Sequence, residues 1–251
     1  MLAVFKREFK AYFANPLGFI ILAVIYFFLG LGFSQIYSSG APVVEYVVMF
    51  PAQIGLLFFV VPVITMRLFS DERRTKTDQV LFTAPVKLIS IVLGKFFSAF
   101  ALYALGFVPT IIFQIIISAY VSVNIFYFIY SLLGVLLLGA ALIAVGMFIS
   151  SLTESPIISI IFTLIANLFI MFSGSFAGMI TVPTTTNNFL EAIRAFFLNV
   201  AVKFLNGMNF LGVLESFGNQ ALVIKDIIFF LSIAVAFVFL TERSLEKRRW
   251  S

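Results

Sequence analysis

Residues 125–152 read IFYFIYSLLGVLLLGAALIAVGMFISSL and contain no charged side chain. A helix of about 20 apolar residues crosses the hydrocarbon core of a bilayer, so this stretch predicts a transmembrane helix. Its residues do not alternate between polar and apolar types, as the strands of a membrane β-barrel do. We therefore predict an all-α membrane protein.

Other stretches meet the same requirement of length and polarity, and together with Ile125 to Leu152 they give six predicted transmembrane helices. The other five are Leu17 to Tyr37, Val47 to Phe69, Phe96 to Tyr120, Pro156 to Ile180 and Ile227 to Leu240. The last stretch is short for a span, so we expect its helix to begin before Asp226 or to be tilted.

The composition supports the same class. Hydrophobic residues make up 62% of the chain and charged residues 11%, whereas about 25% of a typical soluble domain is charged. A soluble fold of this length could not bury so much apolar surface, so we predict a single transmembrane domain over residues 1–251. The chain has no cysteine and no histidine, and we predict no metal site and no catalytic residue.

The basic residues are distributed unevenly around the spans. Thirteen of the 16 Lys and Arg residues lie before the first span, between the second and third, or after the sixth. Six spans place these three segments on one side, and basic segments favour the cytoplasm. We predict a plasma-membrane protein with both termini and the tail 241–251 in the cytosol. The net charge of +5 is then a topology signal, and no nucleic-acid partner is needed to explain it.

Two segments outside the spans have amphipathic patterns. Residues 1–15 predict an elbow helix that lies in the membrane interface and ends at Asn15, because a residue before proline avoids the helical conformation. Residues 181–225 predict one or two helices on the extracytoplasmic side, interfacial or re-entrant. At the outer end of span five, Gly174 and Gly178 form a GxxxG spacing that favours close helix packing, within the chain or between subunits.

The loop 70–94 reads SDERRTKTDQVLFTAPVKLISIVLG. Its charged residues are followed by apolar Leu81 and Phe82, a combination that suits a short helix docking into a partner's groove; a plain solvated connector is the alternative. The chain contains no GxxxxGK[ST] sequence, and the Gly94-Lys95 pair has Ile89 where that motif needs glycine. The chain is therefore expected not to bind ATP through such a loop.

At this loop the sequence resembles a known family. The stretch MRLFSDERRTKTDQVLFTAPVKLISIVLGKF, residues 66–96, resembles the segment after the second span in ABC-2-type permeases. The matching positions are Glu72, Arg73, Arg74, Thr77, Leu81, Pro85, Val86, Gly94 and Lys95. NPLGFIILAVIYFFLGLGF near the start resembles the same family, and KDIIFFLSIAVAFVFLTERSLEKRRW near the end is similar to its gliding-motility-type branch. One departure is Lys76, since the family's cluster commonly has glycine before the threonine.

The resemblance implies a half-size permease subunit of an exporter, which forms a homodimer or heterodimer. A separate cytosolic ABC ATPase would bind ATP and Mg, and this chain would hold no cofactor. The ATPase contacts implied by the resemblance are Asp71, Glu72, Arg73, Arg74, Thr77, Leu81 and Phe82, with Thr153 and Glu154 as a second coupling turn. A non-transporting membrane scaffold or regulator is the alternative. The apolar spans favour a hydrophobic or amphiphilic substrate over an ion.

The predicted topology can be tested because the chain has no cysteine. Single cysteines at Thr75, Ser151 and Ser244 should resist an impermeant thiol reagent in intact cells, and one at Thr185 should react. Labelling of Ser244→Cys without labelling of Thr185→Cys would reverse the orientation.

Overall fold

The structure, a computed structural model, describes residues 1–39, 48, 55–77, 87–120, 125–181, 189–218 and 224–249. Every element in these ranges is helical, as the sequence predicts for its fold class. The helices are α1 (Leu2–Ala14), α2 (Leu17–Ser39), α4 (Leu56–Thr65), α5 (Ser70–Arg74), α7 (Leu88–Leu105), α8 (Val108–Ser118), α9 (Ile125–Leu152), α10 (Pro156–Met179), α11 (Phe189–Gly207), α12 (Phe210–Gly218) and α13 (Ile224–Arg249).

Within the described ranges, five helical stretches are long and apolar enough to cross a membrane. They are Leu17–Gln35, Leu88–Ser118, Ile125–Leu152, Pro156–Met179 and Ile224–Arg248. Helix α9 has the bounds of the fourth predicted span, and α13 begins before Asp226, as expected for the short sixth stretch. The chain is thus built as a multi-pass membrane protein.

Two predicted spans differ from the helices that the structure shows. Helix α7 begins at Leu88 rather than Phe96, so residues 88–94 belong to this helix and not to the predicted loop 70–94. Hydropathy places a boundary at the charge of Lys95, whereas its side chain is buried inside the helix bundle. The second predicted span is described only in part, by Val48 and α4, and as a full crossing it stays a prediction.

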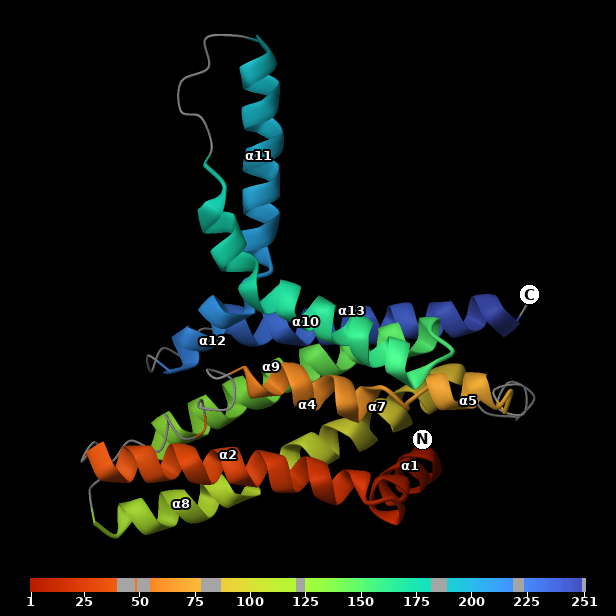
Figure 1. Ribbon diagram of the computed structural model, residues 1–251, viewed down its shortest axis with the longest axis vertical. Helices are drawn as coiled ribbons and strands as arrows, with labels where there is room; N and C mark the ends of the chain where they lie inside the picture. The colour runs from red at the N-terminus through yellow and green to blue at the C-terminus, as the bar shows by residue number, and fades with distance from the viewer. Residues whose placement is uncertain are drawn as a thin grey trace.

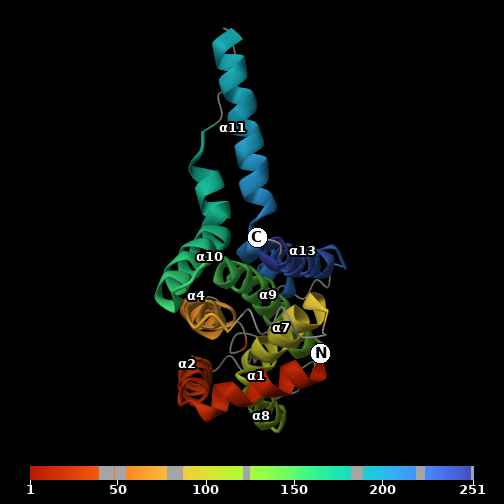
Figure 2. The same cartoon turned by 90° about the vertical axis from the view of Figure 1, so that its right-hand side faces the viewer.

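Helix α9 lies in the middle of the bundle, between α10, α13, α7 and α4 (Figure 2). Its glycines allow neighbours to approach closely. A Cβ atom added at Gly139 would lie 2.1 Å from the ring of Tyr103 on α7, and the Tyr103 hydroxyl donates a 2.9 Å hydrogen bond to the Val135 carbonyl. At Gly134 an added Cβ would meet the Phe217 ring of α12 at 2.7 Å.

Different helices lie at the two ends of the bundle. Helix α1, helix α5 and the last turns of α13 lie at the same end (Figure 1). The last part of α10 turns away from the bundle and runs beside α11, which projects from the bundle in both views (Figures 1 and 2). The segment 181–225 thus contains two helices, α11 and α12, and its residues 182–188 and 219–223 lie outside the described ranges.

The contact between Gly139 and Tyr103 predicts an effect on stability. Gly139→Ala should lower the free energy of unfolding by about 1–3 kcal/mol, because the added methyl group overpacks a filled core. Gly30→Ala is the control, since a Cβ at Gly30 of α2 would have no atom within 4 Å. Thermal unfolding of the purified variants measures both. Equal unfolding temperatures for the two variants would contradict the packing described here.

Candidate functional site

The charged segment after α4 forms a short helix that is fastened to α9. Helix α5 has Asp71 and Glu72 in its first turn and two arginines in its last, which complements the helix dipole at both ends. The Ser150 hydroxyl of α9 accepts hydrogen bonds from the backbone N–H groups of Phe69 (3.2 Å) and Ser70 (3.3 Å). It also lies 3.2 Å from the Met66 carbonyl oxygen, to which it donates. The start of α5 therefore has hydrogen-bond partners although it is buried.

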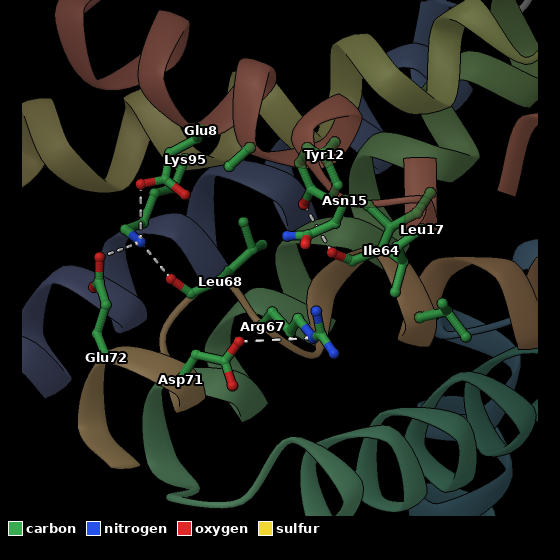
Figure 3. A pocket seen from close by; sticks show the side chains of 12 residues that line it. Glu8, Tyr12, Asn15, Leu17, Ile64, Arg67, Leu68, Asp71, Glu72 and Lys95 are labelled. Atoms are coloured by element: carbon green, nitrogen blue, oxygen red, sulfur yellow. Dashed lines mark hydrogen bonds and ion pairs between the residues drawn. The ribbon is translucent and has the colours of Figure 1, made fainter. Parts of the chain in front are cut away.

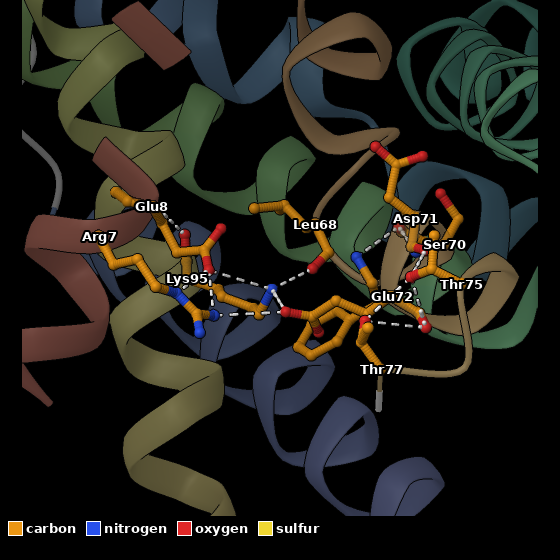
Figure 4. A network of polar contacts seen from close by, with 12 residues as sticks. Arg7, Glu8, Leu68, Ser70, Asp71, Glu72, Thr75, Thr77 and Lys95 are labelled. Atoms are coloured by element: carbon orange, nitrogen blue, oxygen red, sulfur yellow. Dashed lines mark hydrogen bonds and ion pairs between the residues drawn. The ribbon is translucent and has the colours of Figure 1, made fainter. Parts of the chain in front are cut away.

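Lys95 of α7 is the centre of the site (Figure 4). Its side chain is 1% exposed, and its ammonium group lies 2.8 Å from Glu72 Oε1 of α5 and 3.5 Å from Glu8 Oε1 of α1. It also donates a hydrogen bond of 2.5 Å to the Leu68 carbonyl and lies 5.0 Å from the centre of the Phe69 ring. One buried cation thus joins three helices that are far apart in the sequence.

A second cation completes this cluster. Arg7 of α1 lies 2.6 Å from Glu8 Oε1 and 3.4 Å from Glu72 Oε1, so two cations and two carboxylates balance each other. The Glu72 Oε2 atom is buried without a hydrogen-bond partner among the described residues. Breaking a buried ion pair leaves an uncompensated charge, which costs more than the pair contributes. We expect the cluster to fix α1, α5 and α7 relative to one another.

Helix α1 is held by two further contacts. A Cβ at Gly94 would lie 2.9 Å from Val4 and 3.2 Å from the Met1 carbonyl, so the glycine lets α1 lie directly against α7. The Tyr12 hydroxyl donates a 2.8 Å hydrogen bond to the Ile64 carbonyl of α4. Burial raises the pKa of Tyr12, which keeps this donor protonated.

The structure brings the two predicted coupling segments together. Arg73 of α5 lies 3.0 Å from Glu154 in the turn between α9 and α10, and it donates a 3.1 Å hydrogen bond to the Ser151 carbonyl. Thr153, in the same turn, donates to the Ile149 carbonyl. Glu154 is 73% exposed on its side chain. The two segments thus share one surface.

After α5 the chain makes a tight turn. Lys76 has a positive φ of 56°, and the Thr77 N–H donates to the Glu72 carbonyl over 3.0 Å. Arg74, Thr75, Lys76 and Thr77 are exposed there. The predicted anchors Leu81 and Phe82 lie in 78–86, outside the described residues. Their contact with a partner remains a prediction.

The two glycines of the predicted GxxxG spacing have different surroundings. A Cβ at Gly174 would meet the Asn209 side chain at 2.4 Å, so Gly174 packs within the chain, and one at Gly178 would meet no atom within 4 Å. A role for Gly178 between subunits stays a prediction.

Two cavities flank the ion pair between Arg67 and Asp71, whose charged atoms are 3.6 Å apart. One, of about 210 Å³, lies between α1, α4 and α5 and reaches Tyr12, Asn15 and Lys95 (Figure 3). The other, of about 680 Å³, lies between α5 and the start of α10. Within the described ranges, no group of three or more acidic, histidine or cysteine side chains could hold a metal ion.

Sequence reasoning missed the inner half of this site. Lys95 was counted as a topology signal, and Glu8 was not singled out. The available signal was that Lys95 follows an apolar helical run, Leu88 to Gly94, in which a lone charge requires a buried partner.

Comparison with known proteins gives one match. The protein-family model described as ABC-2 family transporter protein matches residues 33–241 of this chain. No curated protein and no solved structure matches it.

The buried cluster predicts a large effect for one substitution. Lys95→Met should lower the free energy of unfolding by about 3–5 kcal/mol, because Glu8 and Glu72 lose the buried cation between them and keep only Arg7, whose side chain is 56% exposed. Adding Glu72→Gln should restore part of the loss, since it removes one of these charges.

The control is Arg243→Met, which removes an exposed pair with Glu246 and should change the stability by about 0–1 kcal/mol. Chemical unfolding of the three proteins is the measurement. The cluster would be of little importance if Lys95→Met behaved like Arg243→Met.

Proposed function

Because this chain belongs to the ABC-2 transporter family, we propose that it is the permease subunit of an ATP-driven exporter. The family is a membrane component of transport and normally works with an ATP-binding subunit. We propose that a separate cytosolic ABC ATPase binds ATP and Mg and that this chain carries the cargo across the membrane. A dimer of two such chains, or of this chain with a related one, would complete the transporter.

The observation that carries the proposal is the shared surface of α5 and the turn at Glu154. Its exposed groups are the side chains of Arg74, Thr75 and Lys76 and the carboxylate of Glu154. Mixed charges at the edge of an interface set orientation and the rate of association. We propose that this surface docks the ATPase, with Leu81 and Phe82 as apolar anchors.

The internal contacts of α5 support a mechanical role for this surface. Helix α5 is joined to α9 through Ser150, to the turn before α10 through Arg73, and to α7 and α1 through Lys95. A displacement of α5 would therefore act on all four helices at once. In this proposal the ATPase moves α5, and the attached helices change the access of the cargo site.

The same assignment orients the chain. If α5 meets a cytosolic ATPase, then α1 and the end of α13, which lie at the same end of the bundle, are cytosolic as well. The basic residues before the first span and after the last support this orientation through the preference of such segments for the cytoplasm. We propose the cell membrane as its location, with α1 as the interfacial elbow helix.

A non-transporting scaffold is the alternative function. It would use the same surface to bind a partner but would not change the partner's ATP turnover. The two functions can be distinguished by reconstituting the chain in vesicles with a P-loop ATPase from a neighbouring reading frame. A permease couples ATP turnover to movement of cargo into the vesicles, and a scaffold does not.

Reversing two exposed charges tests the docking surface. The double variant Arg74→Glu/Lys76→Glu should weaken ATPase binding about tenfold, since exposed ion pairs contribute ~1 kcal/mol or less each. Its unfolding temperature should not change, because both side chains are exposed. The measurement is co-purification of the ATPase and its titration onto the reconstituted chain.

Lys247→Glu is the matched control, because it changes an exposed charge on α13 and leaves α5 untouched. Both proteins should insert alike. If the double variant binds and couples the ATPase as the parent chain does, the docking surface lies elsewhere.

A further inference from the structure

Helix α10 carries a stripe of polar side chains on its buried face. Ser159, Thr163 and Asn167 recur at four-residue spacing, which places them on one face of a helix, and none of them has exposed surface. Their polar atoms are the Ser159 and Thr163 hydroxyls and the two amide atoms of Asn167. All of these atoms lack a hydrogen-bond partner in the described part of the chain.

The stripe makes no hydrogen bond to the described residues of the helices that it faces. At Gly146 of α9, an added Cβ would lie 2.4 Å from Thr65 Oγ1 and 2.9 Å from Thr163 Cγ2, so α4, α9 and α10 converge there. The Thr65 hydroxyl donates to the Val61 carbonyl of its own helix at 3.0 Å. The buried face of α10 that carries Ser159, Thr163 and Asn167 is called the polar seam below.

The unpaired polar groups of the seam lower the stability of the conformation that the structure shows. The three residues lie in a stretch long and apolar enough to span the membrane, where an unpaired polar group cannot be hydrated by bulk water. Alanine or leucine would fill the same positions without this penalty. Unpaired buried polar groups are rare in native proteins and call for an explanation, and use in another conformation is one that suits a transporter.

The polar seam begins near α5, the helix that the ATPase moves in the proposed mechanism. The cavity of about 680 Å³ is lined by Pro156, Ile157 and Ile160 of α10 and by Met66 and Arg67 after α4. Ile160 is the direct neighbour of Ser159 in the sequence, so the cavity lies at the end of α10 where the stripe begins. Helix α5 forms the other wall of this cavity through Asp71, Glu72, Arg74 and Thr75.

The opposite face of α10 is exposed and apolar. Its large side chains include Ile157, Ile161, Ile165, Phe169 and Phe172, each at least 41% exposed. A single helix thus presents hydrogen-bonding groups on one side and a hydrocarbon surface on the other. An amphiphile needs both of these environments.

We infer that α10 separates from α4 and α9 during transport, and that the polar seam then binds the uncharged, hydrogen-bonding head of an amphiphilic cargo. Ser159, Thr163 and Asn167 donate to and accept from hydroxyl or amide groups of that head, and its apolar part lies on the exposed face of α10. An uncharged head fits because the stripe contains no charged side chain. The inference rests on the proposed function and adds the class of cargo to it.

The first test measures stability of the purified chain without an ATPase. Thr163→Val and Asn167→Leu keep the shape of the side chain and remove the unpaired atoms, so both should raise the unfolding temperature. Ser131→Ala should raise it as well, because Ser131 of α9 also has a buried hydroxyl without a described partner; Ser131 lies outside the stripe, so this variant is the control for the binding test below. A lower unfolding temperature for Thr163→Val and Asn167→Leu would show that the seam is bonded in the resting state, and would overturn the inference.

The second test measures binding of a photoreactive alkyl glucoside to the chain in lipid nanodiscs. Labelling of peptides from α10 should become about fivefold weaker for each hydrogen bond lost, in Thr163→Val and Asn167→Leu but not in Ser131→Ala. An alkyl trimethylammonium probe of equal chain length should label α10 weakly in all proteins. Equal glucoside labelling in the parent and the stripe variants, or stronger labelling by the cationic probe, would overturn the inference.

Neither test needs ATP hydrolysis, because a probe that binds only the separated state of α10 also increases the population of that state. A negative result would therefore leave the proposed docking of an ATPase untouched, and a failure of the ATPase to bind would leave both measurements valid.

Discussion

The burial of the Lys95 ammonium group is the constraint on which one end of the structure depends. A cation removed from water must be surrounded by opposite charge and hydrogen-bond acceptors, because its lost hydration is worth several kcal/mol. Glu8, Glu72 and the Leu68 carbonyl supply these groups from three separate segments. None of the three segments can move away alone without exposing the others to that cost. One charge therefore links α1 and α5 to α7, in addition to the packing of Gly94 on Val4.

The spans could be predicted from the sequence because the bilayer imposes length and polarity on each helix. The prediction was accurate where the apolar run ends in polar residues on both sides, as for α9, which begins at Ile125 and ends at Leu152. The start of the helix was wrong at α7, which begins at Leu88 and not at Phe96. Hydropathy cannot distinguish a solvated lysine from a paired one, since the partners of Lys95 are 23 and more residues away in the sequence.

The candidate site was predictable in part for a related reason. The run from Asp71 to Arg74 is visible because charges are rare in this chain, and the structure places it beside Glu154, as a shared surface requires. The sequence could not show that Glu8 of α1 and Lys95 of α7 meet behind it. It also could not show the direction of the polar stripe on α10, because Ser159, Thr163 and Asn167 could have faced a subunit, the lipid or the core.

The four charges of α5 do not form one uniform surface, and this changes how each should be understood. Glu72 points inward to Lys95, and Arg73, with a side chain only 13% exposed, reaches the α9–α10 turn. Arg74 is exposed, and Asp71 pairs with Arg67 at the border of the two cavities. Changing Glu72 therefore disturbs the fold before it can disturb a partner, whereas changing Arg74 affects only what binds from outside. A short helix with an internal and an external set of charges can be held firmly by its own chain and still present a surface to another. This arrangement suits the mechanical role proposed for α5. A displacement of its exposed residues would also displace its buried residues, which are joined to α7 and α9.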